Sequence, residues 1–205
     1  MLKKFIAVMA LVSLPVFAWA ADYQAGTHYV VLDKPIKVSS TEVVVVNEFF
    51  GYTCPHCNEF EPQLHRWASE QTDNVSFMPI PVVFGRSWEP YAKVYFVALN
   101  LGVLEQTHQA MYDAVHIDER RMTNRKALAN FFAEHGVSQA DFDGAYDSFD
   151  LQNKLRQGSR LAAQAQITGV PSMLVNGKYM VNATLAGSKE GMLAVVDYLV
   201  KLETQ

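Results

Sequence analysis

The two cysteines of the sequence, Cys54 and Cys57, stand three positions apart and are its clearest candidates for chemistry. A pair at this spacing can be a catalytic or redox-sensing dithiol, half of a zinc site, or a structural disulfide. A structural zinc site needs four ligands, and no second cysteine pair is present. A structural disulfide here would stabilise the fold by only about 2 kcal/mol, because the loop that it closes is so short. The pattern therefore favours a dithiol that exchanges disulfides with other thiols.

A predicted strand and a predicted helix meet at this pair and would position it. Residues 43–50 form an apolar run rich in valine, which is typical of a strand buried on both faces. From Pro55 to Gln71 the apolar residues recur at helical spacing, and proline suits the first turn of a helix. We therefore predict that Cys54 lies at the helix N-terminus and that Cys57 lies one turn further in.

This location makes Cys54 the expected nucleophile. The free N–H groups of the first helical turn and the helix dipole favour negative charge at its sulfur. His56 adds a donor, and a positive charge when it is protonated. These contacts lower the pKa of a thiol, so we expect an exposed, acidic Cys54 and a shielded, resolving Cys57.

Glu48 stands inside the apolar run, where a carboxylate is costly unless it has a partner or a function. It is either a strand-end residue that reaches water or a partly buried proton acceptor beneath Cys57. Glu61 is expected to be a solvated helix residue that can contact the same network. His65, His108, His116 and His135 have no partner visible in the sequence and receive no role.

The first 20 residues have the composition of a signal peptide. Lys3 and Lys4 precede an apolar stretch too short to span a bilayer, and Ala18-Trp19-Ala20 forms a small-x-small cleavage site. We expect cleavage after Ala20, with a retained membrane anchor as the alternative. After cleavage, the mature protein would lie outside the cytoplasm, where a disulfide can persist. The net charge of −4 gives no sign of the basic face that nucleic-acid binding needs.

The remaining sequence predicts a sheet interrupted by helices. Short strands are predicted over residues 29–32, 35–38 and 75–82, and we expect the prolines of the third to fray it or turn it out of the sheet. Strand, helix and strand in this order indicate a βαβ unit with parallel strands. From residue 87 to 165 the pattern is helical throughout, with Gly102 and Gly136 as stops and Ser138 with Asp141 as a cap.

The C-terminal part returns to strands. Two apolar runs flank Asn176-Gly177, a strong hairpin signal, and Val170-Pro171 opens the first of them. Residues 188–202 predict an amphipathic helix with Met192, Val195, Val196 and Leu199 on one face.

The motif resembles the thioredoxin superfamily and, within it, the DsbA family of bacterial periplasmic thiol oxidases. The dipeptide between the cysteines is Pro-His, and the Glu-Phe-Phe before them and the Phe-Glu after them are also similar to that family. The resemblance implies the α/β class and a thioredoxin fold with an inserted helical subdomain. The thioredoxin-fold domain would comprise residues 21–86 and 166–205, and the insertion residues 87–165.

The resemblance also implies the site. Cys54 and Cys57 would form a redox-active disulfide tuned by Pro55 and His56, and an acid occupies the place of Glu48 in such proteins. Pro171 would be cis and packed against the dithiol. Because proline lacks an N–H, the backbone of Val170 would stay free to pair with a client chain.

The expected activity is thiol oxidation in exported, unfolded proteins, with the Cys54–Cys57 disulfide as oxidant and no further cofactor. A membrane partner resembling DsbB would reoxidise the enzyme, which we expect to be a periplasmic monomer. An apolar rim near Val170, Met173 and Met192 is predicted to bind clients. Two alternatives stay open: a reductase or isomerase of the same fold, and a chaperone-like module that binds peptides without turnover.

Overall fold

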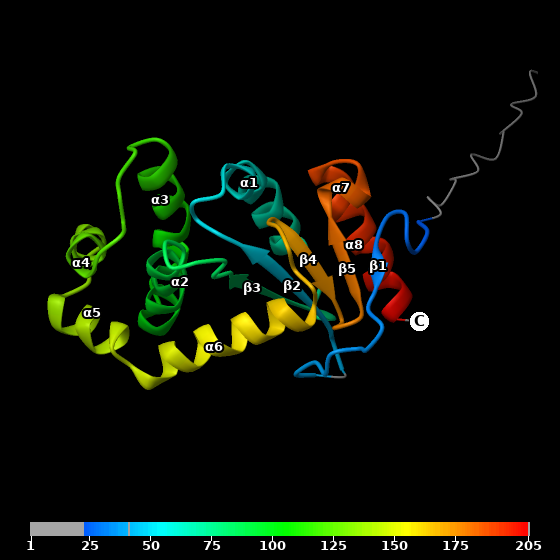
Figure 1. Cartoon of the computed structure of the whole chain (residues 1–205), viewed down its shortest axis with the longest axis horizontal. Coiled ribbons are helices and arrows are strands. Elements are labelled where there is room, and N and C mark those ends of the chain that lie inside the picture. The colour runs from blue at the N-terminus through cyan, green and yellow to red at the C-terminus, as the bar shows by residue number, and fades with distance from the viewer. Residues whose placement is uncertain (1–22, 41, 205) are drawn as a thin grey trace, which may run out of the picture.

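A five-stranded mixed sheet forms the centre of the protein (Figure 1). The computed structural model describes residues 23–40 and 42–204, so the predicted signal peptide, residues 1–20, lies outside the described residues. The strand order is β1-β5-β4-β2-β3, and only β2 and β3 are parallel neighbours. The strands are β1 (Val30–Val31), β2 (Val44–Phe50), β3 (Val75–Pro81), β4 (Ser172–Val175) and β5 (Tyr179–Asn182).

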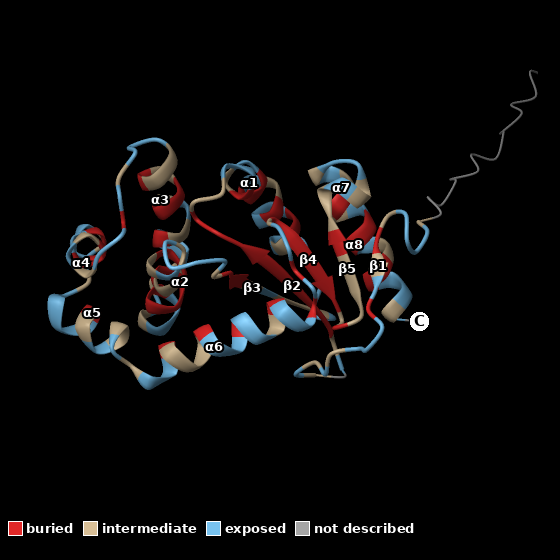
Figure 2. Cartoon of the chain, viewed as in Figure 1, coloured by how far each residue is buried: buried red, intermediate tan, exposed pale blue. Residues whose placement is uncertain are grey.

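The central strand β2 is buried along its whole length, as its valine run predicts (Figure 2). Helices α1 (Pro55–Ser69) and α8 (Lys189–Glu203) pack on one face of the sheet, where Val46, Leu64 and Val196 share a core cluster. Because side chains alternate along a strand, Phe49 points to the opposite face, where it packs with Ala162 of α6. The helix that begins at the dithiol and the C-terminal helix therefore cover the same face of the sheet.

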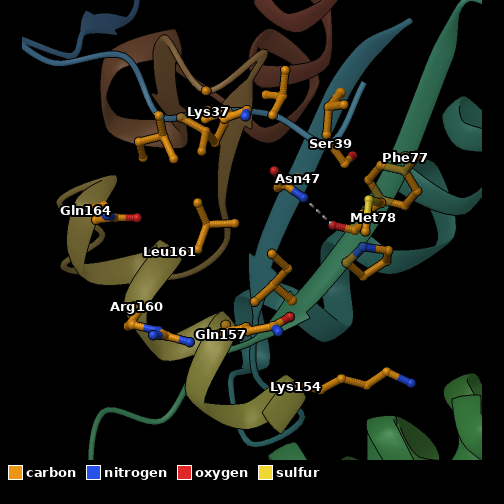
Figure 3. A pocket seen from close by; sticks show the side chains of 18 of the residues that line it. Lys37, Ser39, Asn47, Phe77, Met78, Lys154, Gln157, Arg160, Leu161 and Gln164 are labelled. Carbon is orange, nitrogen blue, oxygen red and sulfur yellow. Dashed lines mark hydrogen bonds between the residues drawn. The ribbon is translucent and has the colours of Figure 1, made fainter. Parts of the chain in front are cut away.

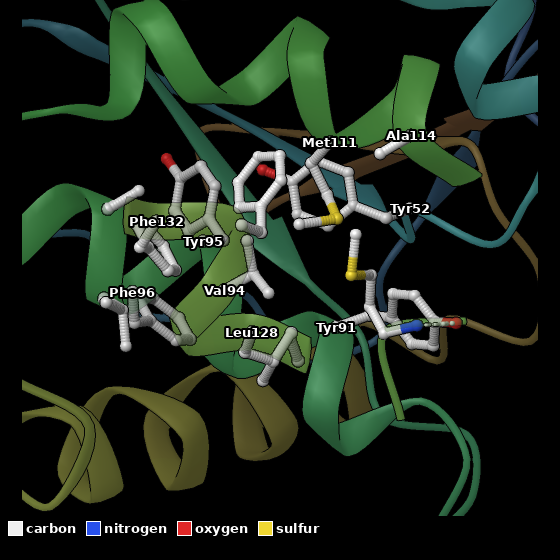
Figure 4. Packing of buried hydrophobic residues seen from close by; sticks show 14 of the residues in the cluster. Tyr52, Tyr91, Val94, Tyr95, Phe96, Met111, Ala114, Leu128 and Phe132 are labelled. Carbon is white, nitrogen blue, oxygen red and sulfur yellow. Dashed lines mark hydrogen bonds between the residues drawn. The ribbon is translucent and has the colours of Figure 1, made fainter. Parts of the chain in front are cut away.

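Five helices lie between β3 and β4, as the sequence predicts. They are α2 (Glu89–Leu101), α3 (Leu104–His116), α4 (Arg125–Glu134), α5 (Gln139–Tyr146) and α6 (Phe149–Gln164). In Figure 1, α2 to α5 lie together beside the sheet and α6 leads back to it. Their aromatic core (Figure 4) is continuous with Phe50, Tyr52 and Cys57, so the helical part borders the dithiol directly. The last turns of α6 already pack on the sheet, so these contacts do not mark an end of the helical subdomain at residue 165. That boundary stays a prediction.

Local capping signals are found where the sequence places them. The Ser138 hydroxyl accepts the N–H of Asp141, and Gly102 ends α2 with a φ of 69°. Asn176 and Gly177 both have positive φ, and the N–H of Lys178 closes their turn on the Val175 carbonyl. Short-range chemistry is therefore enough to fix these ends and turns.

Two strand predictions are wrong. Residues 35–38 form no strand; instead the Ile36 N–H donates to the carbonyl of Gly177, whose α-carbon fits closely against the Ile36 backbone. The prolines of β3 do not fray it, since the strand pairs with β2 as far as Pro81. Alternate residues of β3 bond β2, so Pro79 and Pro81 direct their missing N–H groups to the free edge of the sheet.

Helix α7 (Ala183–Ala186), capped by Asn182, is a short helix that was not predicted from the sequence. Among the described residues, no helix has the length and apolar character that crossing a membrane requires.

Candidate active site

Cys54 is the N-cap residue of α1, with an extended backbone, and Pro55 occupies the first helical turn. The Cys54 carbonyl accepts the N–H groups of Cys57 and Asn58, both at 3.1 Å, while its own N–H donates to Gly51 at 2.9 Å. The backbone therefore fixes the Cys54 sulfur at the positive end of the helix, as predicted. Both cysteines are free thiols here, so the structure describes the dithiol form.

The pKa of Cys54 falls to about 6. Donation from the Cys57 thiol lowers it most, and the backbone N–H groups of Cys57 and His56 add to this against the opposing effect of burial. The charge of His56 contributes least. Cys54 is therefore mostly thiolate at neutral pH, and its partner cysteine is the main reason.

Cys57 has the opposite character. It is fully buried, and its pKa is raised by its donation to Cys54, then by burial and by the charge of Glu48. One helical turn thus carries a thiolate at the surface and a thiol that keeps its proton in the core. This is the division between attacking and resolving sulfur that the sequence predicts.

The Val170–Pro171 peptide bond is cis, as the family resemblance implies. The carbonyl oxygen of Val170 lies 3.5 Å from the Cys54 sulfur, although the two residues are far apart in the chain. A client bound through its cysteine to Cys54 would therefore lie beside the Val170 backbone.

The alternative that Glu48 is a strand-end residue that reaches water is wrong, because only 1% of the residue is exposed. Neither carboxylate oxygen has a hydrogen-bond partner among the described residues. Burial, followed by the charges of Glu61 and Cys54, raises the pKa of Glu48 well above its usual range. Burial thus favours the neutral form of Glu48, and the charge of Glu48 in turn raises the pKa of Cys57.

Glu61 corrects a second prediction, because it is buried and not solvated. Its Oε2 lies 3.4 Å from Nε2 of His108, whose Nδ1 is 2.6 Å from the Tyr52 hydroxyl. Burial raises the pKa of Tyr52, so its hydroxyl stays protonated and shares a hydrogen bond with Nδ1 of His108, while the other ring nitrogen faces Glu61. Sequence reasoning missed His108 because only the fold brings α3 against α1.

A cavity of about 390 Å³ lies beside this group and is lined by Glu48, Glu61 and His108 among others. The side chains of Glu48 and Glu61 therefore line the same cavity, at the border of the helical insertion. Among residues 23–40 and 42–204, no three His, Cys, Asp or Glu side chains are grouped to hold a metal ion.

The His56 side chain is largely exposed, with its Nδ1 3.6 Å from Oε2 of Glu59. The same carboxylate oxygen binds Nζ of Lys189 at 2.5 Å. His56 is thus held by a surface network that joins α1 to the start of α8.

We expect His56→Ser to raise the pKa of Cys54 by only a fraction of a unit. Solvent screens an exposed charge, and the N–H at position 56 persists in the variant. The ultraviolet absorbance of the thiolate, followed against pH, measures this, with His65→Ser on the same helix as control. A rise of a full unit or more would show that the side chain, and not the Cys57 thiol, controls the acidity.

Met173 and Met192 do not form a client-binding rim, which corrects that prediction. Both are fully buried in the core between the sheet and α8. Of the three predicted rim residues, only Val170 reaches the surface beside Cys54.

Two aromatic residues near the dithiol were not singled out from the sequence. Trp88 packs so closely on Gly51 that a side chain at Gly51 would collide with its ring. Phe84 contacts Trp88 edge to face, with ring centroids 5.2 Å apart, and is 45% exposed. These rings provide apolar surface next to the loop that carries Cys54.

An acidic thiolate and a shielded thiol on one helical turn can form and break disulfides in other proteins. In a thioredoxin fold, this arrangement defines the class of thiol:disulfide oxidoreductases.

Comparisons with known proteins specify the family. The family model described as a DSBA-like thioredoxin domain matches residues 45–190. The thiol:disulfide interchange protein DsbA of Pseudomonas aeruginosa is 35% identical over 198 residues, which cover 96% of this chain and 94% of that protein. DsbA of Azotobacter vinelandii is 37% identical over 183 residues, covering 89% and 86%. The chain belongs to the DSBA-like thioredoxin-domain family.

Solved structures agree with this assignment. The crystal structure of Pseudomonas aeruginosa DsbA matches with a TM-score of 0.86 and 35% identity, over 90% of this chain and 96% of that one. The oxidoreductase DsbA from Xylella fastidiosa matches with a TM-score of 0.83 and 32% identity, over 89% and 98%. The thioredoxin fold with its helical insertion is thus the fold of the family.

Proposed function

We propose that this oxidoreductase works as an oxidase, which donates a Cys54–Cys57 disulfide to proteins that need one. The observation that carries this is the low pKa of Cys54, about 6, beside a fully buried Cys57. A sulfur that is stable as thiolate is a good leaving group, and this favours transfer of the disulfide to the client.

The reaction then has two exchanges. A client thiolate attacks Cys54; the new bond joins client to Cys54, and Cys57 leaves as a thiolate that needs a proton. Glu48, whose raised pKa favours the protonated form and whose charge acts on Cys57, would supply it. A second client thiolate attacks the client sulfur of the mixed disulfide, and Cys54 departs as thiolate. The client has lost two electrons and the enzyme has gained them.

We expect Glu48→Gln to slow client oxidation about tenfold or more, because an amide cannot transfer the proton. The variant should also be more stable than wild type at pH 7. A carboxyl group with a raised pKa must take up a proton on folding, and this cost disappears as pH falls toward 4. Stopped-flow oxidation and urea unfolding at both pH values measure the two effects. An unchanged rate would remove Glu48 from the mechanism.

The expected clients are unfolded proteins exported from the cytoplasm, and the exposed surface of Val170, Phe84 and Trp88 supports binding of apolar segments. Its relatives by sequence are interchange proteins named DsbA, which supports a periplasmic location and a membrane oxidase resembling DsbB as the reoxidant. Reoxidation would reverse the exchanges: the Cys54 thiolate attacks the partner's disulfide, and Cys57 then attacks Cys54 and releases the partner's sulfur. The proton of Cys57 passes to Glu48 when that carboxyl group is in its ionised form.

Two assays run side by side test the direction. We expect rapid oxidation of a peptide with two cysteines by the oxidised protein, and slow reduction of insulin in the presence of dithiothreitol. The opposite order of rates would make the protein a reductase. The Cys54→Ala variant tests the hypothesis of a chaperone-like module without turnover. If this variant still suppresses client aggregation and the wild type shows no turnover, the protein is a peptide-binding module.

A further inference from the structure

A second large cavity in the part of the chain that the structure describes lies away from the dithiol. It measures about 750 Å³ and is bounded by α6, α2, strands β2 and β3, and residues 36–39 (Figure 3). Asn47 lines it from β2, and because side chains alternate, Asn47 points to the face opposite Glu48. The cavity therefore lies on the opposite face of the sheet from the space beside Cys57, although Phe77, Pro79 and Tyr95 line both.

The walls of this cavity are mainly apolar. Its lining includes Ile36, Phe77, Met78, Leu99 and Leu161. Met78 and Leu99 are 45% and 43% exposed, and both are among the few large apolar side chains so exposed in the described residues. Cavities of this size and character suit the apolar part of a small molecule.

The charges around the cavity have one sign. Lys37, Lys154 and Arg160 line it, and no Asp or Glu does, although the chain as a whole has a net charge of −4. Lys154 is bound to Asp150 and Asn100. Lys37 and Arg160 make no ion pair or side-chain hydrogen bond with any described residue. Two cations are thus available to a ligand.

Asn47 adds a specific polar contact. It is 95% buried, since only 5% of it is exposed, and its Nδ2 donates to the Met78 carbonyl at 3.2 Å. Its Oδ1 accepts nothing from the described residues, and in Figure 3 the amide lies between Lys37, Leu161 and Met78 with the oxygen turned away from Met78. The oxygen is not one of the fully buried polar atoms that lack a partner, so it is open to the cavity, where a ligand N–H can donate to it.

We propose that this cavity binds a small organic anion with an apolar body and one N–H donor, the chemistry of an N-acylated hydrophobic amino acid. The apolar body contacts Phe77, Met78 and Leu161. The carboxylate meets Arg160 and Lys37, and the N–H donates to Asn47 Oδ1. Neither cysteine lines this cavity, so the proposal does not involve the thiol chemistry.

N-acetylphenylalanine is the probe, titrated into ¹⁵N-labelled protein and followed by NMR. We expect shifts at Asn47, Met78 and Leu161, with a Kd on the order of 1 mM for so small a ligand. The neutral N-acetylphenylalanine amide tests the charge, and N-acetyl-N-methylphenylalanine, which lacks the N–H, tests the contact with Asn47. Each should bind about tenfold more weakly.

Variants test the residues. Lys37→Ala and Arg160→Ala should each weaken binding about threefold, and the pair more, as exposed charges of this kind do. Lys201→Ala, on α8 and outside the cavity, is the matched control and should change nothing. Reduced and oxidised protein should bind alike, so failure of the proposed oxidase function leaves this result intact.

Four outcomes would overturn the proposal. They are equal binding of the acid and its amide, no effect of the Lys37 and Arg160 variants, shifts confined to the surface around Cys54 and Val170, and no saturable shift at 20 mM probe. A dimer whose interface covers Met78 and Leu99, detected by sedimentation, would instead assign the cavity to a second copy of the chain and would also overturn it.

Discussion

The reduced, folded protein is expected to take up one iodoacetamide per chain at pH 7, on Cys54, at least about a thousandfold faster than on Cys57. With a pKa of about 6, Cys54 is about 90% thiolate at this pH. Cys57 keeps its proton and is fully buried, so its alkylation must await unfolding. Unfolding a typical domain costs about 5 kcal/mol or more, which sets the thousandfold minimum.

Peptide mass spectrometry after short exposure to the reagent measures the two rates. In guanidinium both cysteines should react alike, which controls for differences between the peptides. Labelling of Cys54 should also fall to half its maximum near pH 6. Equal labelling in the folded protein, or a midpoint near that of an ordinary thiol, would show that α1 does not separate the two sulfurs.

Much of the site follows from the sequence because its geometry is local. Cys54, Pro55 and Cys57 lie within one helical turn, so a strand, a turn and a helix start are enough to place them. The hairpin at Asn176-Gly177 is local for the same reason. The cis bond before Pro171 was expected only from the family resemblance, since nothing in the local sequence separates it from a trans bond.

The errors concern contacts between distant elements. Helical periodicity shows that Met192 shares a face with Val195 and Leu199, and this should have placed it in the core; its flexibility suggested a surface role that burial rules out. Glu61 looked solvated because its partner His108 belongs to another helix. A pattern in one element shows which residues share a face, but it does not show what that face meets.

Asn47 and Glu48 illustrate the same limit within a single strand. Two polar residues interrupt a buried apolar run, and the sequence alone cannot say that they face opposite spaces. The fold gives them separate surroundings: Glu48 adjoins Cys57 and Glu61, whereas Asn47 lines the cavity under α6. Glu48 is the residue that we propose transfers a proton to Cys57, whereas Asn47 presents an amide oxygen without a donor on the opposite face of the sheet.

The second large effect is expected in the stability of the two redox forms, whose difference should depend on pH. In the reduced form, the pKa of Cys54 is about 6 when folded and about 8.5 when unfolded. A lowered pKa gives stability that is complete above the unfolded value and is lost as pH falls through the folded value. The oxidised form has neither thiol. Cys57, whose pKa is raised on folding, opposes this effect only as pH approaches the value of an unfolded thiol, about 8.5.

The magnitudes decide where the two forms balance. The thiolate contributes almost nothing at pH 5, at most about 1.4 kcal/mol at pH 7 and at most about 2.5 kcal/mol at pH 8, and solvent screening of the partly exposed sulfur reduces these values. The disulfide stabilises the oxidised form by about 2 kcal/mol through its short loop. We therefore expect the oxidised form to be the more stable at pH 5. The gap between the free energies of unfolding of the two forms should close by pH 8.

Guanidinium unfolding of both forms at pH 5, 6, 7 and 8 measures the gap. Reduced Cys54→Ala is the matched control, because its stability should lack the rise between pH 6 and pH 8 that the reduced wild type shows. As the gap closes, the reduced enzyme becomes easier to form, so transfer of the disulfide to clients becomes more favourable with rising pH. A gap that stays constant from pH 5 to pH 8 would mean that Cys54 is not an acidic thiol in the folded protein. The oxidase would then lose its driving force, and the reductase hypothesis would take its place.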